Sequence, residues 1–170
     1  MILQKIDKTI YRKHLNKVIG ATIAAMLLLT LGFSTLLIHL VGNPGGSNFM
    51  LNLVGLLIAV TIVGTVLYRV RLRPFMTEVL YVWCLKQELN AIYRKSAKLN
   101  PAVEKNDPNA LIISYFNLKG SIQLYELDDN DLTLNDRRKD LLELEQKIEA
   151  LGLVLSTSDY HRGLLTQLAI

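Results

Sequence analysis

Two long apolar runs on either side of a short turn constrain this chain more than any other feature. Residues 18–41 and 49–68 contain no Asp, Glu, Lys or Arg. Each run is about 20 residues long or slightly more, and a helix rising about 1.5 Å per residue then crosses a hydrocarbon core of about 30 Å. The Leu, Ile, Val and Phe residues of 18–41 favour insertion by about 4 to 8 kcal/mol. The sequence therefore predicts a transmembrane helical hairpin with its turn at 42–48.

Two alternatives fit the runs less well. The core of a soluble protein seldom holds two adjacent chargeless runs of this length. A cleaved signal peptide has a shorter apolar core and a small-x-small cleavage site. Here the first run is followed by Gly42-Asn43-Pro44, which is a turn signal, and then by the second run.

Basic residues flank the hairpin at the ends away from the turn. Residues 1–17 hold five basic residues and one acidic residue, whereas 42–48 carry no charge. The positive-inside rule therefore predicts that both termini are cytoplasmic and that the turn is external. The basic side chains are also candidate contacts for anionic lipid. They are Lys5, Lys8, Arg12, Lys13, Lys17, Arg69, Arg71 and Arg73.

The formal net charge of +4 comes from the N-terminal segment, because residues 69–170 hold 14 residues of each sign. An excess placed beside a bilayer is explained by the anionic leaflet, and no motif for nucleic-acid binding accompanies it. Cys84 is the single cysteine, which excludes an intramolecular disulfide; its apolar neighbours favour a buried small side chain.

The expected fold is an all-α membrane protein, in which a two-helix hairpin precedes a cytoplasmic domain of three to four helices. The expected segments are a basic amphipathic segment at 1–17, transmembrane helices at 18–41 and 49–68, the external turn at 42–48 and the cytoplasmic domain at 69–170.

Small residues recur at a spacing of four within both runs. Such strips let the backbone of another helix approach closely. One strip can serve the contact within the hairpin, and a second can serve another copy or a larger membrane protein. The candidate packing residues are Gly20, Ala21, Ala24, Ala25, Gly55 and Ala59.

The cytoplasmic domain is expected to begin with a helix over 75–99. Pro74 breaks the preceding helix, and Asn100-Pro101 ends the new one. Tyr81 and Trp83 suit either a protein core or a membrane interface, so the sequence leaves open whether this helix lies on the membrane or packs within the domain.

Three further helices are expected at 108–127, 135–151 and 159–168. Asp107 and Pro108 form an N-terminal cap, and Gly152 stops the helix at 135–151. Apolar residues at spacings of three and four predict an interaction seam for helix-helix contact. The seam residues are Leu111, Tyr115, Leu118, Ile122, Tyr125, Leu141, Leu144 and Ile148.

Reactive groups do not gather in the sequence. The acidic stretch 126–131 lacks the glycine of a calcium-binding loop and is expected to be a solvated linker. Asp159 and His161 are two residues apart, so they point to different faces of a helix. We expect no catalytic, metal-binding or cofactor-binding residue and no enzymatic activity.

The N-terminal string from Gln4 to Lys8, the string Tyr11-Arg12-Lys13-His14-Leu15-Asn16, and the hydrophobic hairpin with Asn48-Phe49 resemble a family of small bacterial inner-membrane proteins grouped as a domain of unknown function. The resemblance implies a bacterial cytoplasmic membrane and supplies no activity.

The leading hypothesis is a non-enzymatic accessory or scaffolding protein that presents its cytoplasmic domain to a protein partner or to further copies of itself. An anionic-lipid-binding, membrane-organising protein is the second hypothesis. The third is a subunit of a transporter or enzyme complex whose chemistry lies in another chain.

Overall fold

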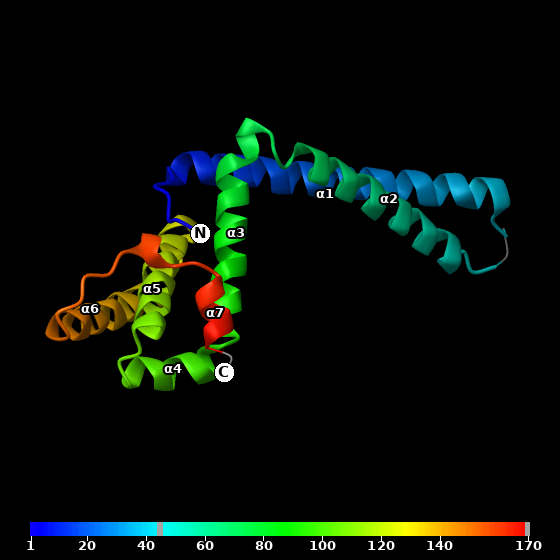
Figure 1. Cartoon of the computed structure of the whole chain (residues 1–170). Helices are drawn as coiled ribbons and strands as arrows, with labels where there is room; N and C mark the ends of the chain where they lie inside the picture. Colours follow the sequence, from blue (N-terminus) through cyan, green and yellow to red (C-terminus); the bar gives the residue numbers. More distant parts are fainter. Residues whose placement is uncertain (44–45, 169–170) are drawn as a thin grey trace. The chain divides into compact units, whose positions relative to one another are not determined.

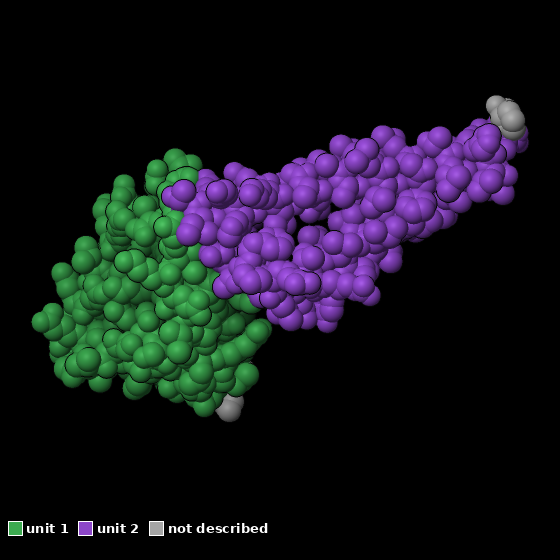
Figure 2. Space-filling model, turned by 90° about the horizontal axis from the view of Figure 1, so that it is seen from above, with its two compact units in different colours: residues 1–8, 81–170 green, residues 9–80 purple. Residues whose placement is uncertain are grey.

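The computed structural model describes residues 1–43 and 46–168, and every regular element in these ranges is helical. The α-helices are α1 Lys8–Val41, α2 Phe49–Val70, α3 Thr77–Tyr93, α4 Ser96–Glu104, α5 Pro108–Asp128, α6 Leu134–Ala150 and α7 Gly163–Gln167 (Figure 1). Two short 3-10 helices are η1 Pro74–Met76 and η2 Thr157–Asp159. The chain divides into two compact units (Figure 2), unit 1 of Met1–Lys8 and Tyr81–Ile170 and unit 2 of Thr9–Leu80.

Unit 2 contains the expected helical hairpin. Helix α2 begins at Phe49 as expected, and α1 ends at Val41. The expected turn at 42–48 includes residues 44 and 45, which lie outside the described residues. At the end of α2, Arg73 has an extended backbone and Pro74 opens η1. The predicted break at this proline is confirmed, because proline disfavours the helical conformation of the residue before it.

The N-terminal segment differs from the expected amphipathic segment at 1–17. Residues 1–7 are not helical, and residues 8–17 are the first turns of α1. The backbone of Gln4 is instead bonded to side chains of unit 1. Its N–H donates to the Tyr81 hydroxyl at 2.9 Å, its carbonyl accepts from the Gln123 amide, and Tyr81 donates to Gln123 at 2.9 Å. These bonds replace the helical partners of the Gln4 backbone.

The single helix expected over 75–99 is wrong. The chain forms η1, then α3, then α4, and Pro101 lies inside α4 instead of ending a helix. A proline at this position leaves the carbonyl of Ala97 without its helical donor. Ala97 and Pro101 are both exposed, so water can bond to that carbonyl and the helix continues.

Helix α5 organises unit 1, since α4, α6, η2 and α7 all pack against it. The Asp107 carboxylate accepts from the Ala110 N–H at 2.8 Å, which confirms the predicted cap. Gly120 lies at a crowded point, where an added Cβ would be 3.2 Å from both Leu85 and Leu89 and 3.7 Å from Leu3. Gly120 therefore lets α3 and the N-terminal segment approach α5 closely.

The predicted stop at Gly152 is confirmed, because this residue has a φ of 67° in the left-handed region that glycine adopts readily. The helix expected at 159–168 is shorter. Ser156 and Asp159 form a capping box around η2, Tyr160 is extended, and α7 begins only at Gly163. The ring of Tyr160 stacks on that of Phe116, with 4.1 Å between the ring centroids.

Candidate functional site

The outer surface of the hairpin is apolar. Helices α1 and α2 are long and apolar enough to cross a membrane, and only 6% and 17% of their most apolar windows are buried. Leu28 is 74% exposed, Leu31 is 65% exposed and Leu57 is 56% exposed. A helix in the core of a soluble protein would have these side chains covered.

Helices α1 and α2 cross where Ser34 meets Gly55. The Ser34 hydroxyl donates to the carbonyl of Asn52 at 3.4 Å, and Ser34 is buried. Gly55, Ala59 and Val63 are the buried residues of α2 and recur at a spacing of four. The small-residue strip predicted at Gly55 and Ala59 therefore lies in the contact within the hairpin.

The small residues of α1 do not take part in that crossing. Gly20 has open space where a Cβ would be added, and Ala24 is exposed. Ala21 and Ala25 instead line a cleft between the two helices. The residue of α1 that contacts Gly55 is Ser34. The predicted strips consist of glycine and alanine, so their spacing does not indicate this serine.

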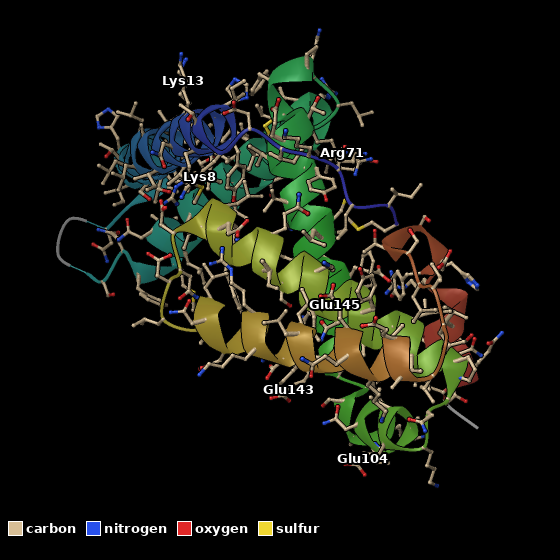
Figure 3. All side chains as sticks on the ribbon, turned by 90° about the vertical axis from the view of Figure 1, so that its left-hand side faces the viewer. Lys8, Lys13, Arg71, Glu104, Glu143 and Glu145 are labelled. Atoms are coloured by element: carbon tan, nitrogen blue, oxygen red, sulfur yellow. The ribbon has the colours of Figure 1, made fainter. Side chains whose placement is uncertain are left out.

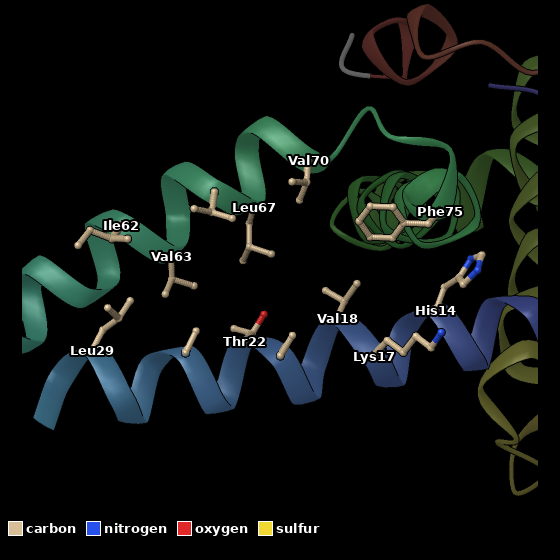
Figure 4. Close-up of a pocket in the computed structure, with 13 residues that line it drawn as sticks. His14, Lys17, Val18, Thr22, Leu29, Ile62, Val63, Leu67, Val70 and Phe75 are labelled. Carbon is tan, nitrogen blue, oxygen red and sulfur yellow. The ribbon is translucent and has the colours of Figure 1, made fainter. Parts of the chain in front are cut away.

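The cleft occupies about 470 Å³ between α1 and α2, on the side of the crossing nearer the basic flanks. In Figure 4, Val63, Leu67 and Val70 of α2 face Val18 and Thr22 of α1. The other lining residues are His14, Lys17, Ala21, Ala25, Leu29, Ile62, Val66 and Phe75. Aliphatic side chains thus form most of the walls. Leu29 and Ile62 line the end of the cleft that is farther from His14 and Lys17.

Charged groups lie only at the flank end of the cleft. Lys17 is exposed there. The Nδ1 atom of His14 lies 3.1 Å from a carboxylate oxygen of Glu78, and each side chain is about a quarter exposed, at 24% and 23%. A carboxylate therefore lies beside His14, and Lys17 is the lining residue that carries a positive charge without an acidic residue beside it among the described residues of the cleft wall.

The predicted basic flank residues have different surroundings. Lys5, Lys13, Arg69 and Arg73 are exposed, and Lys13 projects from α1 in Figure 3. Lys8 forms an ion pair with Asp129 within unit 1. The guanidinium of Arg71 lies 3.8 Å from the centre of the Tyr68 ring, a cation–π contact. Arg12 is half-buried.

Most of the predicted interaction seam lies in an internal contact of unit 1. Leu111, Leu118, Leu141, Leu144 and Ile148 form one buried cluster between α5 and α6, and Tyr115 and Ile122 pack against it. Tyr125 is half-buried outside this cluster. The periodicity predicted a helix-helix contact correctly, but two helices of the same chain satisfy it.

An ion pair adjoins this cluster. Lys119 of α5 lies 2.9 Å from Glu145 of α6. Partial burial lowers the pKa of Lys119, but the hydrogen bond to Glu145 and the nearby Tyr115 outweigh burial, and the pKa is raised. The pair favours the charged lysine and adds little stability because both groups are partly exposed.

The side chains of α3 divide between the core of unit 1 and its surface. Trp83 is 57% exposed and Tyr93 is 74% exposed. Cys84 is also exposed, so the expectation of a buried cysteine is wrong. Tyr81, Val82, Leu85, Leu89 and Ile92 are buried in the core of unit 1. Helix α3 therefore packs within the domain through Tyr81, and Trp83 and Cys84 point away from the core.

A polar cluster around the buried Glu88 of unit 1 was missed from the sequence. The Tyr160 hydroxyl donates to Glu88 at 2.6 Å, and a guanidinium nitrogen of Arg162 lies 3.7 Å from the other Glu88 oxygen. Burial, followed by the bond to Glu88 and its charge, raises the pKa of Tyr160 far above its ordinary value. In the sequence Glu88 follows Leu85 by three positions and precedes Leu89, both of which lie on the apolar face of the helix. This position was the available sign that Glu88 is buried.

The acidic stretch 126–131 is not simply a solvated linker. Glu126 and Asp128 belong to α5, and Asp129 ends that helix with a φ of 56°. Arg138 pairs with Glu126 at 2.7 Å and Lys86 with Asp128 at 2.7 Å. Within residues 1–43 and 46–168, no group of three or more His, Cys, Asp or Glu side chains could hold a metal ion.

Asp159, which was considered together with His161, has a structural partner. Asp159 accepts from the Ser156 N–H at 2.7 Å in the capping box of η2. The exposed carboxylates Glu104 and Glu143, seen in Figure 3, lie on α4 and α6 of unit 1. Neither observation provides a nucleophile with a base beside it.

The described residues therefore define an all-helical chain with two helices suited to cross a membrane. The chain belongs to the family described as "Protein of unknown function (DUF3087)", whose model matches residues 1–165. No curated protein and no solved structure matches the chain.

Proposed function

We propose that this chain is a non-enzymatic integral membrane protein that presents a helical domain at the cytoplasmic face to a protein partner or to a second copy of itself. In this proposal α1 and α2 cross the bilayer, and unit 1 is the cytoplasmic domain. The observation that carries it is the exposure of large apolar side chains along both helices. In water this surface would cost about 25 cal/mol per Å² of apolar area, whereas lipid tails remove that cost.

The direction of insertion is proposed from the charges of unit 2. Lys13 and Lys17 precede the apolar part of α1, and Arg69, Arg71 and Arg73 follow that of α2. Because positive residues are retained on the cytoplasmic side, both termini are placed in the cytoplasm and the turn outside. The resemblance described above favours the inner membrane of a bacterium.

A binding role for unit 1 is supported by its exposed aromatic side chains. Trp83 and Tyr93 are both more than half exposed on α3, and Trp and Tyr are enriched where proteins bind one another. The α5–α6 seam cannot serve this role, since its leucines are already buried.

Purification of the whole chain in mild detergent tests this function. We expect either a defined homo-oligomer or a co-purifying protein that is lost in the Trp83→Ala, Tyr93→Ala double variant. Leu142→Ala, at another exposed site of unit 1, is the matched control and should keep the association. A strictly monomeric protein that captures no partner from native membranes would contradict the proposal.

The second candidate function is the binding and organising of anionic lipid. It is supported by an apolar cleft whose flank end carries Lys17. Exchange of Arg69, Arg71 and Arg73 for glutamine should then weaken binding to anionic vesicles, and added salt should weaken the binding of the original protein. Vesicle binding that is altered neither by the arginine substitutions nor by added salt would argue against this function. A subunit of a transporter or enzyme complex is a third candidate, whose reactive groups would have to come from another chain.

A further inference from the structure

We propose that the cleft between α1 and α2 holds one acyl chain of an anionic phospholipid, with the lipid phosphate at Lys17. This inference rests on the proposed insertion of the hairpin in a bilayer. It concerns a defined site for one lipid molecule, which is distinct from a general attraction between the basic flanks and the leaflet.

The size and walls of the cleft suit an acyl chain. Its volume of about 470 Å³ lies within the range of about 300 to 1,000 Å³ that is usual for small-molecule sites. Leu29, Ile62, Val66 and Leu67 offer aliphatic contacts, and Thr22 is the polar residue along the walls away from the charged end. The side chains of Ala21 and Ala25 on α1 are small, so they leave space between the helices that larger side chains would fill.

The charges at the cleft fix which end the headgroup takes. Lys17 and His14 lie at the end nearer the basic flanks, and the apolar walls extend from there toward the crossing at Ser34 and Gly55. Glu78 lies 3.1 Å from His14, which leaves the Lys17 ammonium to bind a phosphate. An ammonium on a flexible aliphatic stem can rest its stem on apolar surface while its charge meets the headgroup layer.

The cleft separates this lipid from the lipids around the hairpin. A lipid on the outer face of one helix contacts a convex surface on one side. A chain in the cleft contacts α1 and α2 on opposite sides and Phe75 at the flank end (Figure 4). Enclosure on several sides is the feature that distinguishes a binding site from a surface.

The test uses the full-length protein reconstituted in vesicles of equal parts phosphatidylcholine and phosphatidylglycerol, then extracted in mild detergent for native mass spectrometry. We expect one retained phosphatidylglycerol molecule in preference to phosphatidylcholine. Lys17→Gln should reduce that preference about fivefold, because one basic residue near an anionic headgroup has an effect of this size. Lys139→Gln, at an exposed position of α6 in unit 1 that is not among the candidate lipid contacts, should leave the preference within about twofold.

A second pair of variants tests the cleft itself. Ala25→Phe fills it and should abolish lipid retention, while Ala24→Phe, on an exposed position one residue away, should not. Equal retention by these two variants, or equal retention of both lipids by the original protein, would overturn the proposal. Resistance to alkaline carbonate extraction is measured in parallel. An inserted protein that retains no lipid contradicts only the cleft site, whereas a protein released by carbonate contradicts the proposed membrane function.

Discussion

Ser34 and Gly55 approach so closely that a Cβ added to Gly55 would lie 2.5 Å from the Ser34 hydroxyl oxygen and 2.8 Å from its backbone nitrogen. Real Cβ atoms do not approach other atoms to that distance, so α1 and α2 can cross here only while residue 55 has no side chain. The identity of one glycine thus sets the contact between the two helices.

Replacement of Gly55 by a larger residue should push α1 and α2 apart where they cross. Gly55→Leu should cost about 1 to 3 kcal/mol or more of stability, as overpacking of a tight contact does. Thermal unfolding of the full chain in detergent measures the effect. Gly64→Leu on the same helix has open space around it and should unfold near the original temperature. Equal unfolding temperatures for both variants would show that α1 and α2 do not cross at Ser34.

The α5–α6 cluster predicts a contrast between two leucines of one helix. Leu144 is 6% exposed within the cluster, and Leu142 is 58% exposed. Leu144→Ala should destabilise unit 1 by about 2 to 5 kcal/mol through the cavity that it leaves. Leu142→Ala should change stability by less than about 0.5 kcal/mol. Denaturant unfolding followed by far-UV circular dichroism would distinguish them, and similar losses for both would refute the internal role of the seam.

The bond from Tyr160 to Glu88 predicts a stability change in alkali. The folded pKa of Tyr160 is raised above its unfolded value of 10.0, so the stabilising effect of the neutral phenol is complete below about pH 10. It is lost as the pH rises from there toward the folded pKa. Tyr160→Phe should remove that part of the alkaline decline, measured as the unfolding midpoint at increasing pH. If the unfolding midpoints of the original protein and the variant fall in parallel as the pH rises, the bond does not have this effect.

The Tyr81 hydroxyl ties the N-terminal segment to unit 1 through Gln4 and Gln123. Tyr81→Phe removes both of its hydrogen bonds, each with a net value of about 1 kcal/mol. Hydrogen exchange at the Gln4 amide should therefore accelerate about fivefold or more. Tyr93→Phe alters an exposed tyrosine and should leave this amide unchanged. An unaltered exchange rate of the Gln4 amide in Tyr81→Phe would show that these hydrogen bonds do not hold the N-terminal segment to unit 1.

The parts predicted best from the sequence were those with long patterns. The chargeless runs, the Asp107 cap and the Gly152 stop each depend on local chemistry, and α2, α5 and α6 lie within two residues of their expected ends. Pro101 misled the prediction because an exposed helix can continue through a proline when water replaces the lost hydrogen bond. Its exposure depends on the fold, so the sequence could not reveal it.

The candidate sites were harder to predict because they depend on contacts far apart in the sequence. Glu88 and Tyr160 are 72 residues apart, and Gln4 and Gln123 are 119 apart. Five of the seam residues, Leu111, Leu118, Leu141, Leu144 and Ile148, form one buried contact, yet periodicity cannot tell whether the partner helix is in the same chain. Likewise, Ala21 and Ala25 share the spacing of Gly20 and Ala24, and only the placement of α2 decides which pair lines the cleft.

The most direct test of the central claim is the labelling of single cysteines in intact cells by a membrane-impermeant maleimide. In a Cys84→Ser background, Ser47→Cys reports on the connection between α1 and α2, and Lys13→Cys reports on the basic flank; both positions are exposed. The account predicts that Ser47→Cys reacts in intact cells and that Lys13→Cys reacts only after the membrane is permeabilised. Labelling of both positions, or of neither, before permeabilisation would contradict a hairpin that spans the membrane with its turn outside.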